Sequence, residues 1–317
     1  MTDKISQINN INMRIPKVRG IIRKNFELSR LSWLKVGGPA EIFFQPEDED
    51  DLSFFLKNLE TNIPVFVIGA CSNLIIRDGG IPGVVIKLGK NFSSIRLNKY
   101  DVSVGAACRD SYLAQTCAKE GVDLSFLRTI PGNLGGAVKM NAGCYGSYLS
   151  DYLIGLTLIR RDGSITEMKA SDFKFSYRNS NIPDDAIITN VLLRKELDDP
   201  LRIEMKMTRA IDIRNLSQPT KDLSCGSTFR NPLGRSSLED KYDNDHSLKA
   251  WKLIDDAGLR GAKIGGAMVS KKHTNFLINT GNATAKDIED LGKFIIKKVK
   301  TNSGINLIWE VKRVGKY

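Results

Sequence analysis

The sequence predicts a protein of mixed α and β structure with two or three domains. Segments with the apolar pattern of strands intermix with segments of helical periodicity along the whole chain. The chain has 317 residues, more than one domain commonly holds. Its hydrophobic share of 41% and charged share of 26% are those of a globular protein, and a chain of this length can bury a core without disulfides.

The first half of the chain alternates helix and strand signals after a polar arm that ends near Asn25. A helix is expected after Pro46, because acidic residues occupy its first turn and Leu52, Phe55, Leu56 and Leu59 share one face. Short apolar strands are predicted at residues 65–68 and 84–88.

The middle of the chain repeats this alternation. A helix capped by Asp110 is expected to end at Gly121, and strands are predicted at 154–159 and 187–193. The turn at residues 198–200 and the basic stretch to Arg214 indicate a domain boundary.

The last third predicts a helix at 248–257 and a strand-like segment at 267–277. Thr284 and Asp287 resemble a capping box that opens a helix closed by Gly304. Residues 305–311 alternate apolar with mostly polar residues and predict a final strand.

The net charge of +11 is compatible with nucleic acid, a membrane surface or an anionic small ligand as partner. The basic residues are scattered, and the densest group, residues 297–300, closes a predicted helix, where cations suit the dipole. A solvated basic surface explains the charge, so we predict no nucleic-acid partner.

Five cysteines without a C-x-x-C pair fit a reducing cytoplasm better than a disulfide framework. The two histidines, His246 and His273, are not at metal-ligand spacing, so no metal site is expected. No secretory signal pattern and no membrane-spanning apolar run are present, which predicts a cytoplasmic protein without a membrane partner.

Two glycine-rich turns are candidate ligand sites. Residues 69–73 follow an apolar strand, and their small side chains allow a ligand close to the backbone; alone, however, the segment reads as an ordinary turn. Residues 130–143 fit neither G-x-G-x-x-G nor a Walker loop. So many small residues cost helix stability, at roughly 1 kcal/mol per Gly relative to Ala, which favours a ligand over a packing turn.

Three further segments carry groups that could act on a substrate. Tyr177-Arg178 offers a phenol beside a bidentate clamp for carboxylate or phosphate, and Gly226 could let the Ser227 hydroxyl project into a cleft. Glu310 falls on the polar phase of the final strand. Taken singly, these are a surface arginine, a turn and a solvated carboxylate, and no Ser-His-Asp set surrounds Ser227.

Together these segments occur in one order, which is specific. Along the chain they are residues 37–40, 69–73 with Arg77-Asp78-Gly79-Gly80, 130–146, Tyr177-Arg178, 226–232, 265–276 and Glu310. In this order the chain resembles the UDP-N-acetylenolpyruvoylglucosamine reductase family from about Asn25 onward. The short spacing between Arg178 and Ser227 leaves no room for a tyrosine-bearing insert, so the resemblance is to the shorter, type II branch.

The resemblance implies an α+β fold, with a two-lobed FAD-binding unit of the vanillyl-alcohol-oxidase (PCMH) type followed by a mixed α+β substrate domain. The implied ranges are 1–24 for an N-terminal arm, 25–98 and 99–205 for the two lobes, and 206–317 for the substrate domain. The flavin would lie between the lobes, with its diphosphate on the two glycine-rich turns. The implied cofactor-binding residues are Gly69, Cys71, Ser72, Asn73, Leu74, Ile130, Pro131, Gly132, Gly135, Gly136, Ala137, Asn141, Gly143 and Arg214.

The implied reaction is the NADPH-dependent, FAD-mediated reduction of the enolpyruvyl group of UDP-N-acetylglucosamine enolpyruvate to UDP-N-acetylmuramate, a step in peptidoglycan precursor synthesis. By resemblance, Arg178 and Glu310 stabilise the enolate-like intermediate, with Glu310 as a protonated donor because a carboxylate would repel the developing charge. Ser227 would deliver the proton to C2. The implied substrate-binding residues are Tyr177, Arg230, Asn231, Ser270 and Asn275.

Two departures from the family pattern remove no functional group. Cys71 stands where the family usually has glycine, and Trp309 replaces a common proline.

Two alternatives stay open: another FAD oxidoreductase of this fold, such as an oxygen-dependent alcohol oxidase, and a non-catalytic basic module that binds nucleotides or RNA. The implied partners are the UDP-sugar and NADPH, and no oligomer is required.

Overall fold

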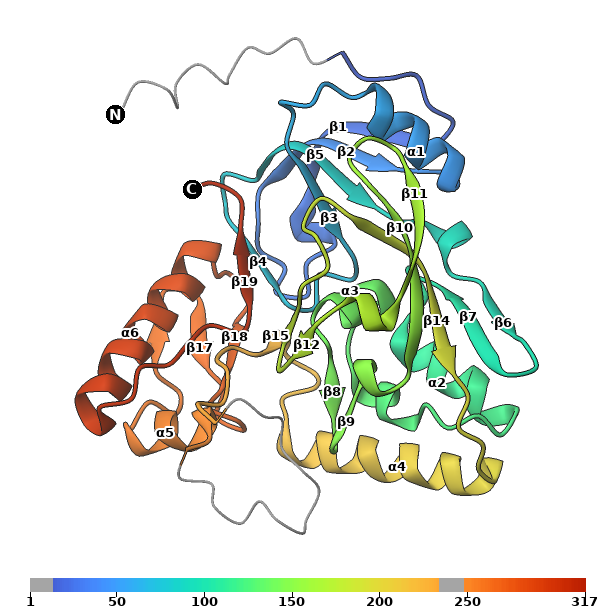
Figure 1. The fold of residues 1–317 in the computed structure, drawn as a ribbon. Coiled ribbons are helices and arrows are strands. Elements are labelled where there is room, and N and C mark those ends of the chain that lie inside the picture. Colours follow the sequence, from blue (N-terminus) through green and yellow to red (C-terminus); the bar gives the residue numbers. More distant parts are fainter. Residues whose placement is uncertain (1–13, 234–247) are drawn as a thin grey trace.

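Three sheets of four or five strands organise the protein, whose computed structural model describes residues 14–233 and 248–317 (Figure 1). The first sheet has the order β1-β2-β5-β3. Its strands are β1 (Ile21–Glu27), β2 (Pro39–Gln45), β3 (Val65–Ile68) and β5 (Ile81–Lys87). Strand β1 is antiparallel to β2, whereas β2 and β3 both run parallel to β5.

Helix α1 (Glu49–Asn58) packs against this first sheet, where the rings of Phe44 and Phe55 lie 4.1 Å apart. The Asp48 side chain accepts a hydrogen bond from the Asp51 amide and so caps the helix. The predicted helix after Pro46 and the predicted strand at 65–68 are therefore confirmed.

The second sheet is antiparallel throughout, in the order β11-β10-β14-β7-β6. Its strands are β6 (Ile95–Leu97), β7 (Asp101–Gly105), β10 (Leu153–Ile159), β11 (Ile165–Lys169) and β14 (Ile187–Arg194). Helix α2 (Asp110–Lys119) confirms the predicted helix, although the N-cap residue is Arg109 and Asp110 is the first helical residue.

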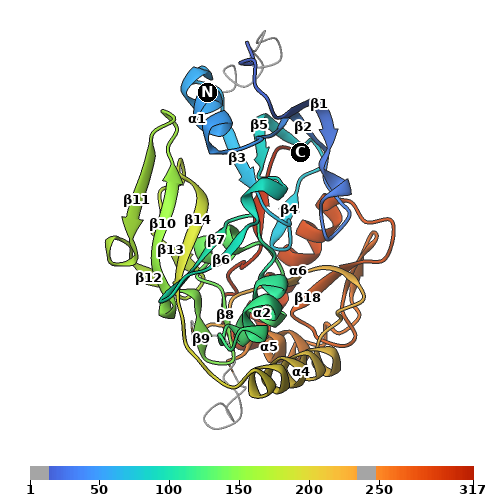
Figure 2. The same ribbon diagram turned by 90° about the vertical axis from the view of Figure 1, so that its right-hand side faces the viewer.

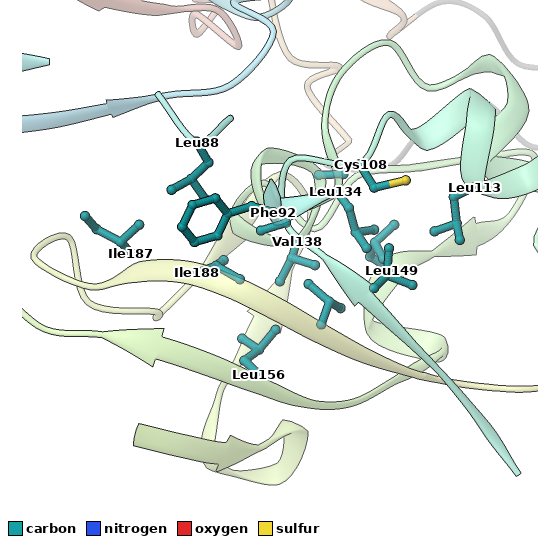
Figure 3. Close-up of a cluster of buried hydrophobic side chains, with 14 of the residues drawn as sticks. Leu88, Phe92, Cys108, Leu113, Leu134, Val138, Leu149, Leu156, Ile187 and Ile188 are labelled. Atoms are coloured by element: carbon teal, nitrogen blue, oxygen red, sulfur yellow. The ribbon is translucent and has the colours of Figure 1, made fainter. Parts of the chain in front are cut away.

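The first two sheets share one hydrophobic core. A single cluster of buried side chains runs from Phe44 on the first sheet and Phe55 on helix α1 to Val191 and Leu193 on the second sheet. Figure 3 shows part of it, where Leu88 and Phe92 meet Ile188 and the helix residues Leu134 and Val138. The short helix α3 (Leu134–Lys139) and the glycine-rich segment before it are thus fixed by this core.

Three short pairings complete this half of the molecule. They are formed by β8 (Gly143–Cys144) with β9 (Ser147–Tyr148), by β12 (Phe175–Ser176) with β13 (Asn179–Ser180), and by β4 (Leu74–Ile76) with the C-terminal β19 (Lys312–Val314). The predicted strand at 305–311 is wrong. Those residues form only an isolated bridge between Trp309 and Phe229, and the final strand begins at Lys312.

Helix α4 (Pro200–Ser217) occupies the region that we interpreted as a turn and domain boundary (Figures 1 and 2). Asp199 caps it, Pro200 stands in its first turn, and Ile203, Met207 and Ala210 are its buried residues. The helix crosses the predicted boundary between residues 205 and 206. The domain ranges stay predictions.

The third sheet, β15-β18-β17-β16, has its own hydrophobic core with α5 (Ala250–Asp256) and α6 (Ala285–Ser303). Its strands are β15 (Leu223–Ser227), β16 (Lys263–Ile264), β17 (Ala267–Val269) and β18 (Phe276–Asn279). The Thr284–Asp287 capping box of α6 is confirmed, and Gly304 ends the helix with φ of 75°.

The Arg77-Asp78 pair ties this third part to the first sheet. The Arg77 Nε donates to Oε1 of the buried Glu289 in α6 at 2.8 Å. The Asp78 carboxylate accepts from the amides of Ala285 and Lys286 at 2.9 and 3.1 Å, at the start of the same helix. Together with the β4–β19 pairing, these contacts hold the C-terminal segment against the first sheet.

Candidate active site

A cavity of about 790 Å³ receives residues from all three parts of the fold. The segment after β3, the segment around α3 and the start of β15 all contribute to its wall. Tyr177, Arg178, Ser227 and Glu310, which are far apart in the sequence, line it as well. The structure therefore brings the main predicted site residues to one space.

The first glycine-rich turn lines this cavity from Gly69 to Leu74 and contacts the other two walls. The Ser72 hydroxyl donates to the Pro131 carbonyl at 2.7 Å. The Asn73 side-chain amide donates to the Glu310 carbonyl at 3.4 Å, and the Lys312 amide donates to the Asn73 carbonyl at 3.1 Å. This turn therefore joins the second glycine-rich turn to the segment that carries Glu310.

Cys71 adopts a left-handed backbone conformation with φ of 54°. Such a conformation favours glycine over residues that carry a side chain. The thiol is buried in a small cluster with Ile68, Ile76 and Val85, and burial raises its pKa to about 11. Cys71 is therefore a packing residue whose thiol stays protonated, rather than a nucleophile.

The second turn depends on glycine at two positions for different reasons. Gly132 has φ of 150°, which L side chains rarely adopt. A Cβ atom at Gly135 would lie 3.0 Å from the Ala106 Cβ, so this glycine allows α3 to pack closely against residues 106–108. A Cβ atom at Gly136 would meet nothing within 4 Å, and Gly136 lines the cavity.

The start of α3 offers fewer free amides than its sequence suggested. The Leu134 and Gly135 amides donate to the carbonyls of Cys108 and Ala106, each at 2.9 Å. These two amides therefore attach the second glycine-rich turn to the residues that follow β7. Other residues of the two glycine-rich turns line the cavity.

The other predicted cofactor residues divide into two groups. Ile130, Pro131, Ala137 and Gly143 line the cavity. Asn141 does not line it: its Nδ2 donates to the Ser176 carbonyl at 3.2 Å, and its Oδ1 accepts from the Ser150 amide at 3.0 Å. Asn141 thus holds the strand that leads into Tyr177.

Arg214 reaches the cavity from the last turn of α4. One guanidinium nitrogen donates to the Thr129 carbonyl, whereas Nε is buried without a hydrogen-bond partner among the described residues. Burial lowers the pKa of Arg214 below its ordinary value. A buried cation with a spare donor fits an anionic ligand.

Arg178 and Glu310 form the central ion pair. The Arg178 Nε lies 2.7 Å from the Glu310 Oε1, and the two side chains are 18% and 11% exposed. The same guanidinium donates through Nη1 to the Gly143 carbonyl at 3.3 Å. Arg178 has φ of 54°, so its backbone is held in a conformation uncommon outside glycine.

Tyr177 completes this group from the neighbouring position. Its ring centroid lies 5.1 Å from the Arg178 guanidinium carbon, and its hydroxyl donates to the Glu310 Oε2 at 3.5 Å. Burial, with the Glu310 charge, raises the pKa of Tyr177 to about 12. The phenol therefore remains a proton donor at neutral pH.

Ser227 lies at the end of β15, directly after Gly226, which has φ of 83°. The next residue, Thr228, accepts through its carbonyl from the Glu310 amide at 2.8 Å and donates through its amide to the Asn275 carbonyl at 2.7 Å. Ser227 and Glu310 are thus carried by hydrogen-bonded neighbouring segments.

The other predicted substrate-binding residues lie in the cavity wall or behind it, and their side chains bond the backbone of neighbouring segments. Both ends of the Asn275 amide bond the Phe229 backbone, at 2.9 and 2.8 Å. The Arg230 Nη2 donates to the Arg178 carbonyl at 3.5 Å, and the Asn231 Oδ1 accepts from the Ala250 amide at 3.2 Å. Asn231 and Asn275 line the cavity, whereas Arg230 does not.

Ser270 also lies outside the cavity wall. It is 1% exposed, and its hydroxyl accepts from the amides of Lys272 and His273 at 3.2 and 3.3 Å. Its contacts shape the turn that leads to Asn275.

Sequence reasoning missed two lysines in the cavity wall, Lys139 and Lys312. Lys139 pairs with Asp184 at 2.9 Å and donates to the Ile182 carbonyl at 2.5 Å. Lys312 stands two residues after Glu310 and is the first residue of β19. Burial lowers the pKa of Lys312, with the Lys139 charge as a second cause.

Across residues 14–233 and 248–317, no group of His, Cys, Asp or Glu side chains is arranged to hold a metal ion. In the same ranges, no helix has the length and apolar character needed to cross a membrane. His246 lies outside the described residues.

Known proteins match both halves of the chain. Residues 40–169 match the FAD binding domain, and residues 218–314 match the C-terminal domain of UDP-N-acetylenolpyruvoylglucosamine reductase. The UDP-N-acetylenolpyruvoylglucosamine reductase of Paracoccus denitrificans is 51% identical over 302 residues, which cover 95% of this chain and 98% of the relative. The enzyme of the same name from Cereibacter sphaeroides is 51% identical over 301 residues, with 95% and 97% covered.

A solved structure is also similar over nearly the whole chain. The UDP-N-acetylenolpyruvylglucosamine reductase of Thermus caldophilus has a TM-score of 0.77 at 31% identity, and the match covers 94% of this chain and all of that one (100%).

Proposed function

The chain belongs to the UDP-N-acetylenolpyruvoylglucosamine reductase family, and from this premise we propose how its own residues carry out the reaction. It is an FAD flavoprotein oxidoreductase of peptidoglycan precursor synthesis, because relatives of this activity match it along nearly their whole length. The fold is the PCMH-type FAD-binding unit followed by the C-terminal domain of the family.

The residues around the cavity fit FAD. The cavity is large, two glycine-rich turns face it, and Arg214 keeps a spare donor in its buried Nε. We propose that residues 69–74 and 130–137 hold the diphosphate, with Arg214 as a cationic partner. When bound, FAD supplies the hydride for the carbon–carbon double bond of the substrate, with NADPH as the proposed source of reducing equivalents.

The Arg178–Glu310 pair is proposed to bind the enolpyruvyl carboxylate and to stabilise charge that develops on it. Addition of hydride at C3 moves negative charge towards this carboxylate, and a buried guanidinium stabilises that charge strongly. The Glu310 Oε1 accepts a hydrogen bond from the Arg178 Nε at 2.7 Å. A substrate carboxylate beside Arg178 adds a second negative charge, which favours protonation of Glu310 and turns it into a hydrogen-bond donor.

Ser227 is proposed to give the proton to C2 of the substrate. A serine is a weak acid, but the enolate-like species is a strong base, and the proton moves over a short distance. Gly226 before it has a left-handed backbone, and Thr228 after it accepts a hydrogen bond from the Glu310 amide, so the backbone around Ser227 is held beside the segment of Glu310. This proton transfer completes the reduction to UDP-N-acetylmuramate.

Tyr177, Arg230, Asn231, Ser270 and Asn275 are proposed to position the rest of the substrate. Tyr177 does so beside Arg178, and Asn231 and Asn275 line the same cavity. Arg230 and Ser270 lie behind this wall and would act through the turns that they support. We further propose that the enzyme works in the cytoplasm, that it requires no oligomer, and that it has no nucleic-acid or membrane partner.

The observation that carries this proposal is the convergence of Arg178, Ser227 and Glu310 on one cavity with the two turns. We expect the purified protein to be yellow and to release FAD on heating. Without oxygen, NADPH should bleach the visible flavin bands, and the enolpyruvyl substrate should restore them.

Other outcomes of this experiment would contradict the proposal in distinct ways. A colourless protein that binds RNA in a salt-dependent manner would indicate a basic nucleic-acid module instead. Absorbance restored by oxygen but not by the enolpyruvyl substrate would indicate the alcohol-oxidase alternative. Equal bleaching rates with NADH would contradict the choice of NADPH alone.

A further inference from the structure

Trp309 stands directly before Glu310 and has no part in the chemistry proposed above. It does not line the cavity, whereas Glu310 does. Its half-buried indole ring packs instead against the hydrophobic core that α6 forms with the third sheet. Trp309 therefore connects this core directly to a residue of the site.

The ring occupies a notch in α6 that exists because residue 292 is glycine. A Cβ atom at Gly292 would lie 2.1 Å from the Trp309 Cη2 and 2.4 Å from its Cζ2, far inside van der Waals contact. Glycine inside a helix is less favourable than alanine. The buried Gly292 thus gives α6 a local cost in exchange for close contact with this ring.

Two further side chains hold the ring. Phe229 lies against it with the ring centroids 5.1 Å apart, and the Arg313 guanidinium carbon lies 4.7 Å from its centroid. Phe229 is 1% exposed, and the Asn275 side chain bonds its backbone in both directions. The Arg313 Nη1 lies 3.7 Å from the Oε2 of Glu289, a buried residue of α6. The indole is therefore held between α6 and the segment that follows β15.

A short antiparallel bridge between Phe229 and Trp309 joins that segment to the C-terminal one. Two hydrogen bonds of 2.8 Å flank the bridge, from the Glu310 amide to the Thr228 carbonyl and from the Arg230 amide to the carbonyl before Trp309. A pairing this short is marginally stable, and its register is specified strongly only where packed side chains fix it. The seated indole is the side chain that does so here.

We propose that Trp309 is a positioning residue for the reaction, which fixes Glu310 relative to Ser227 through its seat at Gly292. Glu310 and Ser227 reach the cavity from the two segments that the bridge joins, so a shift of the ring changes the distance between them. A misplacement of about 1 Å caused by a remote change can lower the rate of an enzyme about 10²-fold. This inference rests on the proposed function, since it takes Glu310 and Ser227 as reacting groups.

The test measures flavin bleaching by NADPH and its return with the enolpyruvyl substrate, by anaerobic stopped-flow absorbance. Gly292→Ala forces the outer atoms of the indole to move by about 1 Å or more to reach ordinary contact distance. We expect the substrate-dependent return to become about 10²-fold slower. Bleaching needs neither Glu310 nor Ser227 and should stay within about threefold of the parent rate.

The decisive variant combines Gly292→Ala with Trp309→Phe. Phenylalanine lacks the outer indole atoms that the new methyl group would meet, so the double variant has room for both side chains. We expect its substrate-dependent rate to be about tenfold higher than that of Gly292→Ala alone. Trp309→Phe alone leaves the notch unfilled and should be slower than the parent protein, so the effects of the two changes are not additive.

Trp33→Phe is the matched control. Trp33 is 41% exposed and does not line the cavity, so this variant should leave both phases unchanged. Circular dichroism follows the unfolding of each variant. Alanine is the better helix former, so a higher unfolding temperature is expected for Gly292→Ala if the methyl group meets nothing, and a lower one if it meets the ring. If that variant does not fold, Trp309→Ala takes its place with the same expected difference between the two phases.

Two results would overturn the inference. An unchanged substrate-dependent rate in Gly292→Ala, or in Trp309→Ala where that variant replaces it, would mean that the seat of the ring does not position the site. An equal fall in both phases, or no recovery in the double variant, would mean that the ring supports the fold generally. A colourless parent protein, or one whose absorbance the enolpyruvyl substrate does not restore, would instead contradict the proposed function itself.

Discussion

Replacing Ser227 with alanine is expected to slow the substrate-dependent return of flavin absorbance by about 10²- to 10⁴-fold, the usual contribution of a positioned general acid. The hydroxyl lies at the end of β15 in the cavity wall, on a segment hydrogen-bonded to that of Glu310. Bleaching by NADPH needs no proton from this residue and should stay within about threefold of the parent rate. Anaerobic stopped-flow absorbance measures both phases separately.

The comparison of the two phases separates a chemical role from damage to the fold. Ser303→Ala, the same change at an exposed position near the end of α6, is the matched control and should leave both phases unchanged. An equal fall in both phases of Ser227→Ala would show that the hydroxyl supports the site generally and is not the proton donor.

Replacing Arg178 with lysine is expected to lower the same substrate-dependent rate by about 10²- to 10³-fold, the cost of losing one preorganised charge-stabilising group. Lysine keeps the positive charge but cannot contact both Glu310 and the Gly143 carbonyl, as the arginine fork does at 2.7 and 3.3 Å. The rate at saturating substrate should fall more than the apparent affinity, because the contact strengthens as charge develops.

Arg194→Lys provides the control for this change. Arg194 also forms an ion pair, with Glu196 at 2.7 Å, but both side chains are about half exposed, at 52% and 46%. Exposed pairs contribute little, so this variant should behave like the parent protein. A nearly unchanged substrate-dependent rate in Arg178→Lys would mean that a positive charge suffices and that the fork geometry has no catalytic function.

Much of the fold followed from local patterns that the structure confirms. The capping box at Thr284 and Asp287 opens α6, and the apolar stripe of α1 packs against the first sheet. These elements were predictable because their signals lie within a few residues.

The order of the motifs indicated the site, although no single motif did. Arg178, Ser227 and Glu310 are separated by tens of residues, and only the fold joins them. Their position around one cavity depends on the pairing of β4 with β19 and on the hydrogen bonds of Thr228, which connect segments far apart in the sequence.

Two errors have clear physical causes. Helix α4 was taken for a boundary because several of its apolar residues, such as Leu201, Met205 and Leu216, are exposed and obscure the buried stripe. The last strand was placed too early because residues 305–311 alternate like a strand but lack a partner ladder. The sequence predicted Asp110 to be an ordinary helix cap, and only the structure shows that its side chain is buried.

The crystal structure of the flavin-loaded protein with the enolpyruvyl substrate tests the central claim most directly. We expect the substrate carboxylate to contact the Arg178 guanidinium and the Glu310 side chain, with the Ser227 hydroxyl within about 3.5 Å of C2, the reach of a proton donor. A substrate bound with its enolpyruvyl group away from any of these three side chains would contradict the account.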